Sequence, residues 1–291
     1  MTRPTDAADR PLGAHAPAAG GLARSALPYI DAAAAEAVQV FVGNPRGWAP
    51  SPGDPEQDAA FLEGCESRGT AAYIHASLLV NLGSPTPETV TRSAETLAHA
   101  LRRGAVIGAR GVVFHAGSAV DGAHAPQAYR NLREALLPVL DAAMAAGGPR
   151  LLVEPTAGGG VSMAARVEQL GPYLDAVDRH PWLGVCLDTC HAWAAGHDLA
   201  TPGGMTATLD TLVEVCGADR LWLVHANDSK DALGSVRDRH ETIGAGAIGR
   251  TAFAELLAHP ATRGVPVIVE TPSVGSSGHA ADIATLAALR G

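Results

Sequence analysis

Seven of the eight apolar segments that are predicted to be β-strands end on a histidine or an acidic residue. These end residues are, in chain order, His15, His75, His115, Glu154, Asp188, His225 and Glu270. From His75 onward they lie 40, 39, 34, 37 and 45 positions apart, close to the length that one strand, one helix and two loops consume. A parallel barrel brings the carboxyl ends of its strands together at one rim, so these side chains are expected to converge there.

Strand-like and helix-like segments alternate along the chain. The expected strands are mostly continuous apolar runs, at residues 12–15, 38–42, 71–75, 111–115, 151–154, 183–188, 221–225 and 265–270. The expected helices cover a stretch ending near residue 36 and residues 88–109, 125–146, 164–179, 205–216 and 280–289. A doubly wound open sheet is the alternative, but it gathers ligands at one crevice and not from nearly every strand end. The pattern predicts an α/β fold, a (β/α)8 TIM barrel with a metal site at the C-terminal rim of the strands.

Length and composition indicate one domain. A chain of 291 residues with 47% hydrophobic residues can bury a large core, and we expect a single TIM-barrel catalytic domain at 12–291 after a flexible N-terminal tail at 1–11. No apolar run approaches the roughly 18 residues that cross a bilayer, and the tail is too polar for a signal peptide. We therefore expect a cytoplasmic protein without a membrane partner. The four cysteines lack paired spacing and are expected to be buried free thiols.

The net charge does not identify the partner. Its value of −9 is the wrong sign for a protein whose whole surface attracts nucleic acid. Divalent cations at the rim, however, would neutralise the carboxylates that bind them and let that face accept a phosphate. Nucleic acid therefore remains open as a partner.

Two further segments add candidate ligands near the strand ends. Asp188 is followed by His191, and Asp238 and His240 stand two apart, so that an extended backbone points both side chains the same way. One zinc ion takes three or four protein ligands, so nine candidates predict more than one metal, with a carboxylate shared between ions. The nine candidates are five imidazoles and four carboxylates: His75, His115, Glu154, Asp188, His191, His225, Asp238, His240 and Glu270.

Three sequence boxes carry a resemblance to a known family. They are Glu-Pro-Thr-Ala-Gly at 154–158, Cys-Leu-Asp-Thr-Cys-His at 186–191 and His-Ala-Asn-Asp-Ser-Lys at 225–230, followed by Asp-Arg-His at 238–240 and a glycine-rich segment at 244–249. In these boxes the chain resembles the endonuclease IV family of apurinic/apyrimidinic DNA endonucleases. The resemblance spans nearly the whole chain, from Gly13 to Pro272, and fills all nine metal-ligand positions of that family.

The resemblance implies a mechanism and a partner. It implies a monomeric TIM barrel with three Zn²⁺ ions that binds double-stranded DNA with abasic sites and hydrolyses the phosphodiester 5′ to the site, leaving a 3′-hydroxyl. Glu154 is implied as the catalytic residue that bridges two ions. The implied ligand sets are His75, His115 and Glu154; Glu154, Asp188, His225 and Glu270; and His191, Asp238 and His240.

The implied DNA contacts include departures from the family pattern. Leu78 stands where some family members have a tyrosine that enters the minor groove, and Pro155 replaces the usual asparagine beside Glu154. For Asn227, a substrate contact and a loop-capping role are both open. The DNA-binding candidates are Arg46, Leu78, Leu79, Asn227 and Lys230.

Two other functions remain open. A sugar isomerase or epimerase on the same barrel needs only about one metal site, and a non-catalytic DNA-damage-binding protein would keep the ligands without turnover. Three glycines at 158–160 suggest a phosphate-binding loop but lack the following Lys-Ser/Thr, which favours a flexible turn. His15 is expected to hydrogen-bond a ligand and not to be one.

Overall fold

The computed structural model describes residues 10–272 and 278–290. Most of the predicted N-terminal tail, residues 1–9, lies outside this part of the chain. Arg10 is buried, and its guanidinium donates to Thr262 Oγ1 at 3.0 Å and to the carbonyl oxygen of His259 at 3.1 Å. Pro11 is also buried, and its carbonyl accepts from the backbone of Val267. These two residues therefore belong to the folded body and not to a tail.

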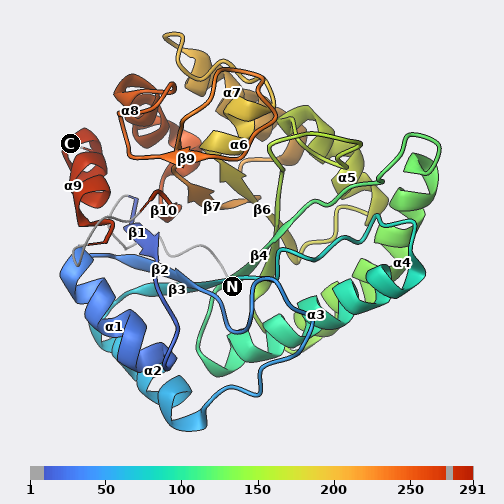
Figure 1. The fold of residues 1–291 in the computed structure, drawn as a ribbon, viewed down its shortest axis with the longest axis horizontal. Coiled ribbons are helices and arrows are strands. Elements are labelled where there is room, and N and C mark those ends of the chain that lie inside the picture. The colour runs from blue at the N-terminus through green and yellow to red at the C-terminus, as the bar shows by residue number, and fades with distance from the viewer. Residues whose placement is uncertain (1–9, 273–277, 291) are drawn as a thin grey trace.

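Eight parallel strands close into a barrel, as the strand-end pattern predicts (Figure 1). Around the barrel the order is β1, β10, β7, β6, β5, β4, β3 and β2, and β1 pairs in parallel with both β10 and β2. The strands are β1 Leu12–His15, β2 Ala37–Val40, β3 Ala71–His75, β4 Gly111–His115, β5 Arg150–Glu154, β6 Leu183–Asp188, β7 Leu221–His225 and β10 Val267–Val269.

Helices surround this barrel on its outer side (Figure 1). In the described part of the chain they are α1 Leu22–Ala33, α2 Pro55–Arg68, α3 Pro87–Val106, α4 Ala125–Ala145, α5 Leu170–Ala176, α6 Thr189–Ala194, α7 Gly204–Cys216, α8 Arg250–Ala258 and α9 Ala280–Arg290. The helix predicted at 164–179 is shorter, since a 3₁₀ turn at Val167–Gln169 precedes α5. The helices α2, α6 and α8 lie outside the ranges that the sequence pattern predicts.

The start of α2 explains why it was missed. The prolines between residues 50 and 55 predict a loop, but Pro55 is the first residue of the helix, where a proline loses no hydrogen bond. The Asp54 side chain accepts from the backbone N–H groups of Glu56 and Gln57 and caps the helix. A proline that indicates a loop in the sequence therefore marks the start of a helix in the structure.

The interior of the barrel forms an apolar layer beneath the rim. It is a separate cluster of buried residues, comprising Ala37, Ala71, Tyr73, Val113, Leu152, Cys186, Leu223 and Ile268. Alternate residues of a strand point the same way, so the residue two positions after each of these, where the strand continues to the rim, also points inward. Val113 thus leads to His115, and Leu152 leads to Glu154. This register places the predicted ligands on top of the apolar layer.

A short antiparallel hairpin extends the rim after β7. Its strands are β8 Asp228–Ser229 and β9 His240–Glu241, and Ser229 pairs with His240. The hairpin was not predicted from the sequence, and it carries two of the predicted ligands back over the barrel. The four cysteines are free and buried, as expected. In the described residues, no helix has the length and apolar character needed to cross a membrane.

Candidate metal centre

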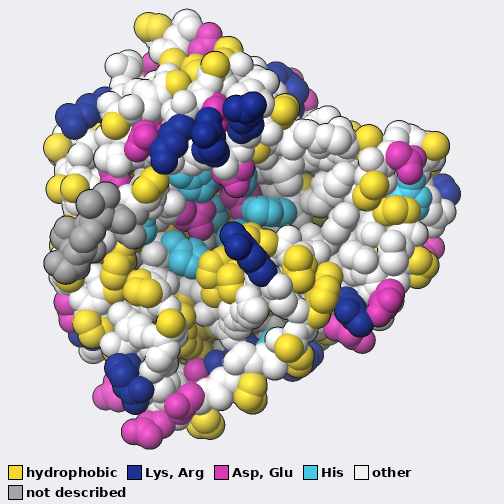
Figure 2. All heavy atoms as spheres, in the orientation of Figure 1, with side chains coloured by type: hydrophobic (Ala, Val, Ile, Leu, Met, Phe, Trp, Pro, Cys, Tyr) yellow, Lys and Arg dark blue, Asp and Glu magenta, His cyan; other side chains and the backbone are white. Residues whose placement is uncertain are grey.

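The nine predicted ligands meet at the carboxyl ends of the strands. Figure 2 shows histidine and acidic side chains gathered in a central hollow, with basic side chains bordering it on two sides. Groups of three of these residues present ligand atoms within 4.8 Å of one another, including His75 with His115 and Glu154, and His191 with Asp238 and His240. Two of the three implied ligand sets are therefore present as clusters.

Glu154 stands at the centre of the cluster. Its side chain is 1% exposed, and its Oε2 lies 3.3 Å from His75 Nε2 and 3.5 Å from His115 Nε2. On the other side, its Oε1 lies 3.0 Å from His225 Nδ1 and 3.4 Å from His191 Nδ1. Burial alone would raise the pKa of Glu154, but the surrounding imidazoles outweigh it and hold that pKa well below its usual value. One carboxylate thus faces imidazoles on both sides, as a bridging ligand must.

The remaining ligands complete two neighbouring groups. His225 Nδ1 lies 3.3 Å from Glu270 Oε2 and 4.0 Å from Asp188 Oδ2. Asp238 lies between two imidazoles, with Oδ2 3.2 Å from His191 Nε2 and Oδ1 2.8 Å from the Nε2 of His240. That Nε2 is buried, yet no group of the described residues, Asp238 Oδ1 included, is in hydrogen-bonding geometry with it. A buried nitrogen in this condition is suited to a metal ion.

Hydrogen bonds to backbone oxygens orient three of the imidazoles. His75 Nδ1 lies 2.8 Å from the carbonyl oxygen of Ala76, His191 Nδ1 lies 3.0 Å from that of Pro155, and His240 Nδ1 lies 3.1 Å from that of Glu270. A proton held on Nδ1 leaves the Nε2 lone pair pointing into the cluster, the arrangement found in metal-ligating histidines. Pro155, the departure beside Glu154, thus keeps the carbonyl group that the site uses.

Gln39 gives His225 the same support from the opposite nitrogen. His225 Nε2 donates to Gln39 Oε1 at 2.9 Å, and Gln39 Nε2 donates to Glu270 Oε1 at 2.6 Å. His15 Nδ1 lies 3.1 Å from the same Glu270 oxygen, in the supporting position expected for it. Gln39 was missed because it is neutral, although a polar residue in a four-residue, fully buried strand was a usable signal.

The protonation preferences also fit a cation. Burial opposes a charged imidazole, but the Asp238 carboxylate, 2.8 Å from Nε2, and the charge of Asp188 raise the pKa of His240 to about 9. Neighbouring carboxylates likewise raise the pKa of His191 well above its usual value, against the opposing effect of burial. The buried carboxylates are therefore stabilised by positive charge. Protons on the imidazoles provide this charge here, and divalent ions would provide it after replacing those protons. An oxygen and nitrogen donor set of this kind fits zinc.

Thiolate ligands are not needed to complete the set. Cys186 and Cys190 lie beside the cluster, within groups of possible ligands. Burial raises the pKa of both thiols to about 12, so they stay protonated in this environment.

Asn227 and Asp228 hold the site together from behind. Asn227 is fully buried, and its amide donates to Asp188 Oδ2 at 2.7 Å and accepts from the backbone N–H of Glu270 at 2.8 Å. Of the two roles left open for Asn227, these contacts favour the structural one over a DNA contact, because both ends of its amide already hold the site's own residues. The buried Asp228 carboxylate accepts backbone N–H groups of the 244–249 loop and caps that loop.

The other predicted DNA contacts lie on the exposed surface of the rim. Leu78 and Leu79 are 41% and 37% exposed, and Arg46 and Lys230 are exposed as well. The backbone N–H of Leu78 donates to the carbonyl oxygen of Pro45 at 2.8 Å, and Ser77 Oγ donates to the same oxygen at 3.1 Å. The loops after β2 and β3 are thus tied together.

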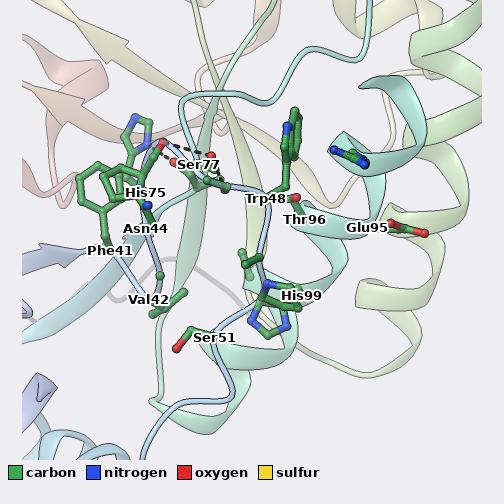
Figure 3. A pocket seen from close by; sticks show the side chains of 18 of the residues that line it. Phe41, Val42, Asn44, Trp48, Ser51, His75, Ser77, Glu95, Thr96 and His99 are labelled. Carbon is green, nitrogen blue, oxygen red and sulfur yellow. Dashed lines mark hydrogen bonds between the residues drawn. The ribbon is translucent and has the colours of Figure 1, made fainter. Parts of the chain in front are cut away.

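A cavity of about 590 Å³ opens beside the cluster, between the segment at residues 41–51 and α3. Figure 3 shows His75 at its inner end and Trp48 above Thr96 of α3, with His99 and Ser51 further along. The loop that carries Arg46 therefore lines a cavity that extends to the predicted metal ligand His75.

A closed parallel barrel with its polar cluster at the carboxyl ends of the strands defines a TIM-barrel enzyme. Residues 28–290 match the family model described as xylose isomerase-like TIM barrel. The chain is 55% identical over 280 residues to the probable endonuclease 4 of Streptomyces coelicolor, covering 96% of this chain and 95% of that relative. The crystal structure of endonuclease IV from Thermus thermophilus has a TM-score of 0.83 and 36% identity, covering 96% of this chain and 98% of that one. The chain belongs to the endonuclease IV family.

The barrel itself is shared more widely. A crystal structure of a D-tagatose 3-epimerase-like protein has a TM-score of 0.70 at 16% identity, over 96% of this chain and 95% of that one. This likeness concerns the fold alone.

Proposed function

We propose that this chain is a zinc-dependent apurinic/apyrimidinic endonuclease that hydrolyses the phosphodiester 5′ to an abasic deoxyribose and leaves a 3′-hydroxyl. The proposal rests mainly on the position of Glu154. Its buried carboxylate has imidazoles against both oxygens and lies at the centre of the nine predicted ligands. A sugar isomerase uses few ligands, and the group of His191, Asp238 and His240 would have no role in it.

Three zinc ions would be held by the three ligand sets. These are His75, His115 and Glu154; Glu154, Asp188, His225 and Glu270; and His191, Asp238 and His240. Bound zinc supplies a Lewis acid for the phosphate oxygens and lowers the pKa of a coordinated water. Glu154, held ionised, orients the attacking water, and Gln39 and Asn227 keep His225 and Asp188 in place.

The abasic nucleotide supplies much of the selectivity. It has no base to unstack, so it costs less to rotate out of the duplex than a normal nucleotide. Arg46, Leu78 and Leu79 lie on the tied loops after β2 and β3, where they would wedge into the duplex and hold it bent. Lys230 is exposed just after β8 and would contact a phosphate.

We expect the purified protein, loaded with zinc, to cleave a labelled duplex that carries one tetrahydrofuran abasic analogue. The matched undamaged duplex should stay intact, because its nucleotides remain stacked. Gel analysis of the product ends measures both results. Binding without cleavage would favour the non-catalytic damage-binding alternative and overturn the proposal.

We also expect about three zinc ions per chain, because the ligands form three sets and one ion takes three or four protein ligands. Elemental analysis of gently purified protein measures this number. A consistent value near one would overturn the trinuclear arrangement and favour the isomerase alternative.

Arg46→Ala is expected to weaken binding to the abasic duplex by roughly 1–3 kcal/mol, the scale of one good nucleic-acid contact. Binding is measured at fixed salt in a catalytically inactive background, since salt alone changes affinity. Arg68→Ala, at the C-terminal end of α2 and so on the far side of the barrel from the rim, is the matched control and should bind like its parent. Unchanged affinity in Arg46→Ala would mean that DNA is held by other loops.

A further inference from the structure

Two valines at the rim have a backbone conformation that valine rarely adopts. Among the described residues, the non-glycine positions with positive φ are Ala34, Val120, Asp178, Arg179 and Val236. Ala34 ends α1 as its C-cap, and the two charged residues follow α5 and form ion pairs. Val120 and Val236 have φ of 70° and 52°, are β-branched and are more than half exposed. This is a genuine outlier for a β-branched residue, and little is gained from burial in return.

Backbone hydrogen bonds hold both valines in place. The N–H of Val236 donates to the carbonyl oxygen of Ala194 at 3.1 Å, and the N–H of Gly234 donates to that of Trp193 at 3.1 Å, so the hairpin is docked on the end of α6. The N–H of Val120 donates to Ser118 Oγ at 2.9 Å. The side chains of Val120 and Val236 thus point into solvent from backbone segments that hydrogen bonds hold in place.

A strip of bare backbone lies between the two valines. Gly158, Gly159 and Gly160, which follow Glu154, have φ of 96°, 91° and 55°. A Cβ added at Gly158 would lie 3.2 Å from Val236 Cγ1, and one at Gly160 would lie 4.0 Å from Ser118 Oγ, two residues before Val120. Val236 therefore lies at one end of a strip that has no side chains, and the loop that carries Val120 lies at the other end.

We propose that Val120 and Val236 are DNA-contacting residues, whose methyl groups pack on the deoxyribose rings of the strand that crosses the glycine strip. This inference rests on the proposed endonuclease function. The loops after β4, β5 and β7 each follow a strand that ends on a predicted ligand, so nucleotides flanking a phosphate at the cluster would lie close to them. A deoxyribose offers an apolar face that valine matches. The strained conformation is then retained because the side chain is used only in the complex.

Glycine variants of the two valines distinguish the effect of backbone strain on stability from the effect of a lost DNA contact on affinity. Val236→Gly and Val120→Gly remove the side chain and relieve the conformation, so each is expected to raise Tm by about 2–4 °C. Each should also weaken binding to the tetrahydrofuran duplex about tenfold, measured at fixed salt in the Glu154→Gln background. Val236→Asn tolerates positive φ but is polar, so it should be as stable as the glycine variant and bind as weakly.

A matched valine provides the control. Val106 is 52% exposed but ends α3, on the far side of the barrel from the rim. Val106→Gly should lower Tm and leave DNA affinity unchanged, the reverse of the rim variants. If the rim glycine variants bind as tightly as the parent, or lose stability together with affinity, the inference is overturned while the proposed function stands. If the parent neither binds nor cleaves the abasic duplex, both are overturned.

Discussion

Glu154→Gln should lower the turnover number for abasic-duplex cleavage by roughly 10³-fold or more, about 4 kcal/mol of transition-state stabilisation. The carboxylate is buried and has imidazoles within 3.5 Å on both sides, so no other described side chain takes its central position. Glutamine has nearly the same volume but no charge to share between two ligand groups. The fold should therefore survive while the chemistry is lost.

Single-turnover cleavage, zinc content and thermal melting, measured on the same preparation, check this expectation. Glu66→Gln on α2 makes the same chemical change at an exposed position and should cleave like the parent. Cleavage at the parent's rate in Glu154→Gln would remove this residue from the mechanism. A large fall in melting temperature would instead show that the residue is mainly structural.

Asp228→Ala is expected to lower the free energy of unfolding by about 3–5 kcal/mol, because several backbone N–H groups lose a charged acceptor and each buried donor left unsatisfied costs about 1–3 kcal/mol. Its carboxylate accepts the backbone N–H groups of Ser229, Gly244, Gly246, Ile248 and Gly249 at 2.8–3.3 Å. The alanine variant leaves these donors without an acceptor, and those of Ser229 and Ile248 are buried. The four donors at 244–249 lie in the loop after β9, which carries His240, so zinc content should fall as well.

Urea unfolding and elemental analysis measure the two effects. Asp228→Asn keeps one acceptor oxygen and should lose less stability than Asp228→Ala. Asp219→Ala changes an exposed aspartate and should stay within about 0.5 kcal/mol of the parent. An unfolding free energy for Asp228→Ala equal to that of the parent would contradict a capping role for this carboxylate.

The residues that the sequence interpretation missed or left open are those whose role depends on a distant partner. Gln39 lies in a strand and contacts His225, 186 positions away, so no local pattern marks it. Asn227 lies two residues after the end of β7, where the sequence is the same whether the side chain faces a substrate or is buried. Only its contacts with Asp188 and Glu270 show that it is buried. The hairpin of β8 and β9 was missed because each of its strands has only two residues.

The sequence by itself determined the barrel and its nine candidate ligands. Strand ends, a repeat close to 40 residues and inward alternation are local properties, and a parallel barrel converts them into one cluster of the six strand-end ligands, whereas Asp238 and His240 reach it through the hairpin that was not predicted. Only the tertiary structure decided which nitrogen of each imidazole faces Glu154 or Asp238, which polar residues support the ligands, and which valines are strained at the rim. These features depend on backbone groups of other elements, such as the carbonyl oxygens of Pro155 and Ala194, whose positions are set by packing and not by neighbours in the chain.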